Sequence, residues 1–253
     1  MIRSQVQKMV FTGLMVAIGI LLNQFIVITL PTPSDPIIKF GVGYLPIMLV
    51  SILFGPVYGL MAGISQDLLG FFLIGSGLGQ TFHLGFTLNA MLYGLVPGLI
   101  FHKAFRKDQW VYFGLNLGLS VALLFGSFWY FFHLDQFAAE TLTQTEKTIL
   151  AGVGIGGAVA LLLANLLVMF SKKYGPSGTK LLFSVASLYI LVSLILTPIW
   201  VTQMNPGIPF WVRIPLRIVK MPIETTVYVV LLALLLKLFT EIIRKKDEKD
   251  IET

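Results

Sequence analysis

Runs of apolar residues recur along nearly the whole chain, and short polar or glycine–proline segments separate them. A membrane-spanning helix needs about 20 largely apolar residues, and fewer where neighbouring helices shield it. By that rule the pattern predicts eight spanning segments, at residues 9–30, 41–54, 57–74, 86–102, 111–133, 148–170, 181–203 and 215–240. The second and third are short and only Gly55–Pro56 separates them, so we expect a tight helical hairpin there.

Composition supports the same fold class. Of the 253 residues, 56% are hydrophobic and only 12% are charged, which leaves too little polar surface to cover a soluble globule. We therefore predict an all-α protein, a polytopic membrane helical bundle forming a single integral membrane domain over residues 1–253. The basic start and long first apolar run lack a small-residue cleavage site, so that run is predicted to be a retained helix.

The charged residues predict the topology. With the N-terminus inside, the segments facing the cytoplasm carry Arg3, Lys8, Lys103, Arg106, Lys107, Lys172, Lys173, Lys180, Lys237, Arg244, Lys245, Lys246 and Lys249. The predicted outer loops carry Asp35, Asp135, Glu140 and Glu146. This asymmetry is the positive-inside bias, and it places both termini in the cytoplasm. The net charge of +6 thus reflects topology and does not predict nucleic-acid binding; residues 241–253 are expected to form a solvated cytoplasmic tail.

Five cations depart from this pattern, namely Lys39, Lys147, Arg213, Arg217 and Lys220, and the last three occur where the last apolar segment begins. Arg213, Arg217, Lys220 and Glu224 fall within an arc of about 60° on a helix of 3.6 residues per turn. The cations could extend toward lipid headgroups from the end of a helix. Lys220 and Glu224 would lie deeper, where ionisable groups are costly unless they face protein or water. We therefore favour a site for a ligand that carries carboxylates.

A second polar region lies in the third and fourth segments. Asp67 would be costly without a partner, and a structural ion pair with Arg217 or Lys39 competes with ligand contact as its explanation. The segment GSGLGQTFHLGFTLNAMLYG adds the polar residues Gln80, His83, Thr87 and Asn89 and the aromatic residues Phe82, Phe86 and Tyr93. Aromatic faces with a few polar groups suit a flat heteroaromatic ligand. Packing would equally explain Phe86, and a loop hydrogen bond would explain His83.

The segments that resemble catalytic or nucleotide-binding motifs do not meet the requirements of those motifs. GVGIGG at 152–157 lies within an apolar segment and has no preceding strand, so close helix packing explains it better than a dinucleotide site. GPSGTK at 175–180 lacks P-loop spacing, and the three histidines are scattered. With no paired catalytic residues, the sequence predicts no enzyme, no cofactor and no metal site.

Several motifs resemble the substrate-binding S components of energy-coupling factor (ECF) vitamin transporters, and among them the folate-specific family. The similarity is carried by KFGVGYLPI, FGPVYG, DLLG and GFTLNA, and by PFWVRIPLRIVKMPIE near the end. It covers most of residues 9–102 and 181–240. S components usually have six helices, so residues 103–180 are predicted to be an inserted helix pair. Lys39 stands where the family often has arginine, and Tyr93 where arginine is expected.

The resemblance implies a function: high-affinity binding of a vitamin, with folate favoured, and uptake driven by partner subunits. Those partners would be a transmembrane T component and two cytoplasmic ATPases. The implied ligand site comprises Lys39, Asp67, His83, Phe86, Asn89, Trp211, Arg213, Arg217 and Lys220. Gly13 and Ala17 form a small-residue pair that would dock on the T component, although internal packing explains it equally well.

Two alternatives stay open. The chain could be an S component for another nutrient, such as pantothenate, a pyrimidine precursor or a queuosine precursor. It could also be a membrane assembly or sensor protein with no role in transport.

Overall fold

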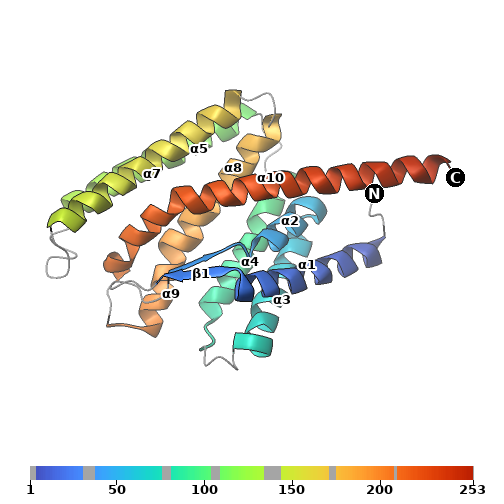
Figure 1. The fold of residues 1–253 in the computed structure, drawn as a ribbon, viewed down its shortest axis with the longest axis horizontal. Helices are drawn as coiled ribbons and strands as arrows, with labels where there is room; N and C mark the ends of the chain where they lie inside the picture. Colours follow the sequence, from blue (N-terminus) through green and yellow to red (C-terminus); the bar gives the residue numbers. More distant parts are fainter. Residues whose placement is uncertain are drawn as a thin grey trace. The chain divides into compact units, whose positions relative to one another are not determined.

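The protein is almost entirely helical in a computed structural model, which describes residues 4–30, 38–75, 81–103, 109–133, 144–170, 175–207 and 210–252 (Figure 1). The α-helices are α1 Gln5–Phe25, α2 Leu45–Phe54, α3 Pro56–Gly70, α4 Leu84–Gly98, α5 Gln109–Phe132, α7 Gln144–Phe170, α8 Gly175–Leu188, α9 Thr197–Met204 and α10 Ile214–Glu252. Short π-helical segments η1 Phe71–Gly75, η3 Leu99–Lys103 and η4 Tyr189–Leu196 extend α3, α4 and α8, and η5 Phe210–Arg213 is a 3₁₀ turn. Two short strands, β1 Val27–Leu30 and β2 Ile38–Gly41, pair with each other.

Six of the described helical segments are long and apolar enough to cross a membrane. Two shorter apolar helices, Leu45–Phe54 and Ile155–Val168, bring the number of apolar helical segments in the described chain to eight. Each of these segments overlaps one of the eight predicted from the sequence, so the prediction of an all-α membrane bundle is confirmed.

The strands are an addition that the apolar pattern did not indicate. Residues 27–30 were assigned to the first spanning helix, but α1 ends at Phe25 and the chain becomes extended. The sequence at this point is Ile26-Val27-Ile28-Thr29, four β-branched residues in succession. Such residues lose side-chain freedom in a helix and pack well in a strand, which accounts for the change.

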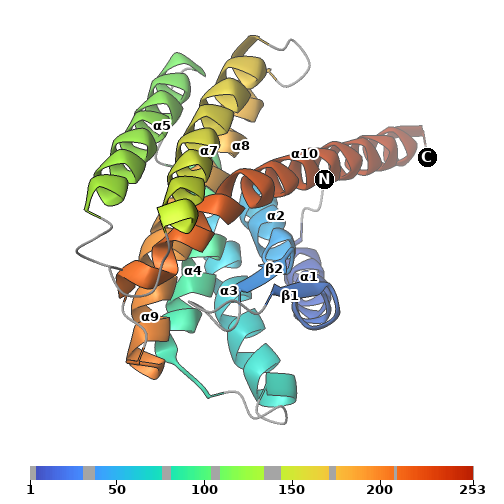
Figure 2. The ribbon, with the colours of Figure 1, turned by 60° about the vertical axis from the view of Figure 1, so that its left-hand side comes forward.

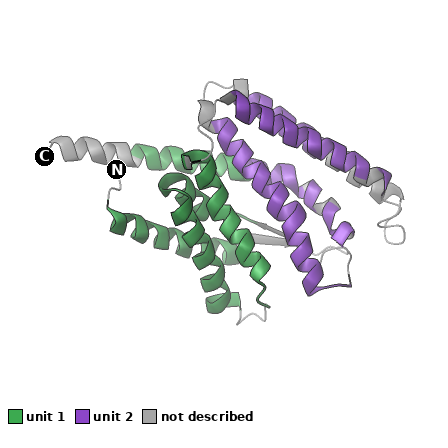
Figure 3. Cartoon of the chain, turned by 180° about the vertical axis from the view of Figure 1, so that it is seen from behind, with its two compact units in different colours: residues 1–28, 39–106, 227–253 green, residues 29–38, 107–226 purple. Residues whose placement is uncertain are grey.

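The described chain divides into two compact units (Figure 3). Unit 1 comprises residues 1–28, 39–106 and 227–253, and unit 2 comprises residues 29–38 and 107–226. The helix α10 contributes its first part, up to Thr226, to unit 2 and the remainder to unit 1. The prediction that residues 103–180 are an insertion into a six-helix core stays a prediction.

In unit 1 the predicted hairpin is confirmed. Residues 45–52 of α2 are all buried, α2 ends at Phe54, and α3 begins at Pro56. Gly55 makes the turn with a φ of 101°, a left-handed conformation that favours glycine. Pro56 suits the first turn of α3 because the missing N–H has no helical partner there.

Helix α4 packs tightly against α3 and α2 in the same unit. A Cβ on Gly94 would overlap the carbonyl oxygen of Gly59, so the two glycines permit the close approach of α3 and α4. The hydroxyl of Ser51 donates to the carbonyl of Gly94 and accepts from the N–H of Gly98 at 2.7 Å. In a regular α-helix the N–H of Gly98 would bond the carbonyl of Gly94 directly, and here the hydroxyl of Ser51 bridges the two. The neighbouring Pro97 has no N–H to donate.

In unit 2, α5 and α7 lie side by side (Figures 1 and 2). Buried asparagines link the helices of this unit. Asn116 on α5 donates to the carbonyl of Thr179 on α8 at 3.1 Å, and Asn165 on α7 donates to the carbonyl of Phe113 on α5 at 3.1 Å. Interhelical hydrogen bonds of this kind supplement van der Waals packing where lipid removes the hydrophobic driving force.

Candidate ligand-binding site

The nine residues of the predicted ligand site fall into two sets, one in each unit. Lys39, Asp67, His83, Phe86 and Asn89 belong to unit 1, and Trp211, Arg213, Arg217 and Lys220 belong to unit 2.

The set in unit 2 begins at η5 and follows one face of α10. Pro215 lies in the first turn of α10, and Arg213 ends η5 immediately before that helix begins. Arg213 is 0% exposed, and Arg217 and Lys220 are each 8% exposed. Cations that extend toward headgroups keep their charged ends accessible, so this degree of burial favours a role inside the protein.

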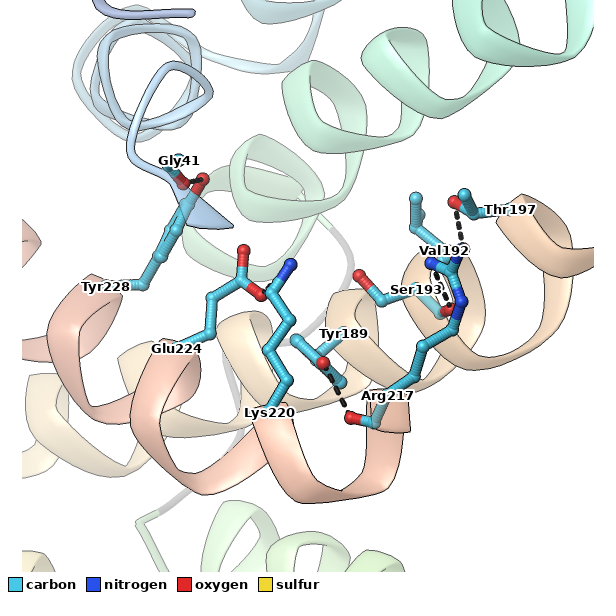
Figure 4. A network of polar contacts seen from close by, with 9 residues as sticks. All are labelled: Gly41, Tyr189, Val192, Ser193, Thr197, Arg217, Lys220, Glu224 and Tyr228. Atoms are coloured by element: carbon cyan, nitrogen blue, oxygen red, sulfur yellow. Dashed lines mark hydrogen bonds and ion pairs between the residues drawn. The ribbon is translucent and has the colours of Figure 1, made fainter. Parts of the chain in front are cut away.

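Arg217 is held by two main-chain contacts to η4 (Figure 4). Its Nη1 donates to the carbonyl oxygen of Ser193 at 3.4 Å, and its own carbonyl accepts from the hydroxyl of Tyr189 at 2.8 Å. Arg213 is held in a similar way, since its Nη2 donates to the carbonyl of Asn205 at 3.1 Å.

The carbonyl of Ser193 is open to Arg217 because of how η4 is built. In a π-helix each carbonyl accepts from the N–H five residues ahead, and the N–H of Thr197 does bond the carbonyl of Val192. The corresponding donor for Ser193 would be residue 198, which is Pro198 and has no N–H. The proline therefore leaves a main-chain acceptor that the guanidinium of Arg217 uses, an arrangement the sequence analysis missed.

Lys220 pairs with Glu224 one turn along the same helix. Lys220 Nζ lies 2.6 Å from Glu224 Oε2, and the two side chains are only 10% and 13% exposed (Figure 4). The i,i+4 spacing brings such side chains together on a helix. Glu224 therefore belongs to this polar face, although it was not among the predicted ligand-binding residues.

Trp211 lies at the start of the same set and is partly exposed. Its ring centroid lies 5.1 Å from that of Phe210, and 6.1 Å from that of Trp129 on α5 at an interplanar angle of 57°. Trp211 thus has aromatic neighbours on two sides, two residues before the buried Arg213.

In unit 1 the structure brings together residues from α3 and α4. The hydroxyl of Thr87 donates to Asp67 Oδ2 at 2.6 Å, so the carboxylate has a hydrogen-bonding partner within its own unit. His83 caps α4 through Nδ1, which accepts from the N–H of Gly85 at 3.1 Å. The ring of Phe86 lies 6.0 Å from that of His83, and Asn89 is buried one turn further along α4.

Lys39 lies on β2, and two side chains fix the main chain just beyond it. Gln66 Nε2 donates to the carbonyl of Gly43 at 3.0 Å, and the hydroxyl of Tyr228 donates to the carbonyl of Gly41 at 2.9 Å. Gln66 is 2% exposed and precedes Asp67 in α3. Gln66 and Tyr228 both bond main-chain carbonyls that are distant in sequence, so no local pattern could have revealed these contacts.

The predicted docking pair lies on an exposed side of α1. Gly13 and Ala17 are both exposed, and no described atom outside the helix lies within 4 Å of the position of a Cβ on Gly13. Docking on another subunit stays a prediction.

Residues 7–243 match the family described as "ECF transporter, substrate-specific component". The chain belongs to this family. The match covers nearly the whole chain, and together with the six helices in the described part of the chain that are able to cross a membrane it makes this a multi-pass membrane protein whose family is one of transport components.

A curated relative is similar over part of its length. The folate transporter FolT of Clostridium novyi (strain NT) is 28% identical over 99 residues, which are 39% of this chain and 53% of the relative. The matched region therefore spans about half of that relative.

Proposed function

We propose that this S component binds folate and is the substrate-binding subunit of an ECF importer. The observation that carries the proposal is the buried cationic face of η5 and α10, where Arg213, Arg217 and Lys220 lie at the start of the last apolar span, Lys220–Glu241. Buried ionisable groups in a membrane protein usually mark the path or site of a substrate. Similarity to a protein named folate transporter supports folate over other anions.

Each proposed role follows from the chemistry of the side chain. Arg217, with Arg213 or Lys220, would hold the carboxylates of folate by charge-assisted hydrogen bonds. Asp67 would accept from the amino-pyrimidine edge of the pterin, with Thr87 orienting the carboxylate through their 2.6 Å hydrogen bond. Phe86 would stack on a ring, and Lys39, His83, Asn89 and Trp211 would complete the site.

The partners follow from the family. A substrate-specific component would associate with a transmembrane T component and with two ATPase subunits that hydrolyse ATP in the cytoplasm. Gly13 and Ala17 on α1 would allow the close helix approach that such an interface needs. Co-purification with these subunits would argue against a role confined to membrane assembly or sensing.

Titration of the purified chain with folate tests the proposed ligand. Trp211 lies within the proposed site, so folate should quench tryptophan fluorescence saturably once its own absorption is corrected for, whereas pantothenate and thiamin should not. If folded protein gives no response to folate, the folate assignment is wrong. Pantothenate, a pyrimidine precursor or a queuosine precursor would then be tested in turn.

The proposed topology can be tested with single cysteines, because the chain contains none. We expect Ser4→Cys to react with a membrane-impermeant maleimide only after the cells are opened, and Gly207→Cys to react in intact cells. Both residues are exposed in the structure, so access within the protein does not limit labelling. Labelling of Ser4→Cys in intact cells would overturn the cytoplasmic placement of the N-terminus.

A further inference from the structure

Among the described residues, α5 and α7 contact the segment that carries the buried arginines at Trp211 and at Pro222. The first is aromatic: the ring of Trp129 on α5 lies 6.1 Å from that of Trp211 in η5. Trp211 precedes Arg213 by two residues within the same 3₁₀ turn. A tilted aromatic pair at this separation contributes beyond the area it buries, so Trp129 restrains the position of η5.

The second contact lies at Pro222, within α10. Pro222 has no N–H to donate to the carbonyl of Ile218, which weakens the helix immediately after Arg217. A Cβ placed on Gly157 of α7 would lie 3.5 Å from Cδ of Pro222 and 3.6 Å from the carbonyl oxygen of Ile218. These are ordinary van der Waals distances, so α7 lies directly against this weakened turn and a side chain longer than a methyl group at position 157 would press on it.

Hydrogen bonds tie the same two helices to the rest of unit 2. Asn165 joins α7 to α5, and Asn116 joins α5 to α8, which continues into η4. Because η4 also supplies Ser193 and Tyr189 to Arg217, this segment is held by η4 as well as by α5 and α7.

We propose that Trp129 and Gly157 are positioning residues for ligand binding, and that the α5–α7 pair exists in this chain to hold Arg213 and Arg217 for the carboxylates of the ligand. The inference rests on the proposed function. It extends that function by assigning a role to helices that contribute no predicted ligand contact. Binding groups gain affinity when their supporting residues hold them rigidly, so loosening the support should weaken the charged contacts first.

Matched variants separate positioning from general loss of fold. Trp129→Ala is compared with Phe125→Ala, one turn earlier on the same helix and 74% exposed. Gly157→Leu is compared with Gly156→Leu, because no described atom outside the helix lies within 4 Å of a Cβ on Gly156. In hydrogen–deuterium exchange without ligand, we expect faster exchange at residues 210–222 in the two test variants only.

Ligand binding gives the second readout. Pteroic acid shares the pterin and benzoate of folate but lacks its glutamate. We expect the test variants to lose about tenfold to about 100-fold in affinity for folate and much less for pteroic acid. Equal losses for both ligands, or unchanged exchange at 210–222, would overturn the proposal. If Gly157→Leu does not fold, the result for Trp129→Ala alone decides whether the proposal stands. If the unmodified protein binds no folate, the proposed function is wrong. The exchange experiment then decides by itself whether Trp129 and Gly157 position residues 210–222.

Discussion

Replacing Arg217 with alanine is expected to weaken folate binding by at least about 30-fold, equivalent to about 2 kcal/mol, because a buried charge-assisted contact to the ligand is lost. The fold should survive the change. Tyr189 bonds the main-chain carbonyl of Arg217, which alanine keeps, although the 3.4 Å hydrogen bond from the guanidinium to Ser193 is lost. Isothermal titration with folate measures the affinity, and a thermal melt in detergent measures whether the fold survives.

Two control variants sharpen this test. Lys237→Ala removes a cation from the same helix, but Lys237 is 75% exposed, so folate affinity should not change. Arg217→Lys keeps the charge and loses the planar fork, and it should bind folate with intermediate affinity. An Arg217→Ala protein whose affinity stays within about twofold of the unmodified chain would remove Arg217 from the ligand site, since a net hydrogen bond to a charged group contributes about 1.5–3 kcal/mol.

The parts of the fold that sequence could predict are those fixed by local chemistry. Gly55 and Pro56 mark the end of one helix and the start of the next, and both do so for reasons confined to their own backbone. The pairing of Lys220 with Glu224 likewise follows from their four-residue spacing. The strand at Val27–Leu30 could have been predicted from its β-branched residues, but mean hydropathy does not distinguish an apolar strand from the end of an apolar helix.

The contacts that could not be predicted are those between residues distant in sequence. Asp67 was assigned either a cationic partner or the ligand, and the structure gives it the hydroxyl of Thr87. Arg217 bonds a carbonyl that is available only because η4 is a π-helix ending before Pro198. A sequence shows Pro198, but it does not show which carbonyl the proline leaves open, because that depends on whether the preceding turn is α or π.

Removing one partner of the buried pair on α10 should have the largest effect on stability. Lys220→Met removes the ammonium that lies 2.6 Å from Glu224 Oε2, and Glu224→Leu removes the carboxylate that pairs with Lys220. Breaking a buried ion pair in this way costs about 3–5 kcal/mol, so each single variant should unfold at a clearly lower temperature. The thermal midpoint of the detergent-solubilised protein, followed by circular dichroism or by aggregation, measures the loss.

The double variant Lys220→Met/Glu224→Leu separates a structural role from a ligand contact. Apolar residues of similar volume often replace a buried pair without loss, so its thermal midpoint should return close to that of the unmodified protein. Because Glu224 neutralises Lys220, we expect Arg213 rather than Lys220 to act with Arg217, and the double variant should bind folate within about threefold of the unmodified chain.

A double variant as stable as the unmodified protein but unable to bind folate would instead make Lys220 a direct contact and Glu224 the residue that holds it in place until the ligand arrives. If the double variant were as unstable as the two single ones, the pair would not be the source of the instability, and the interpretation of Glu224 as the charge partner of Lys220 would be wrong.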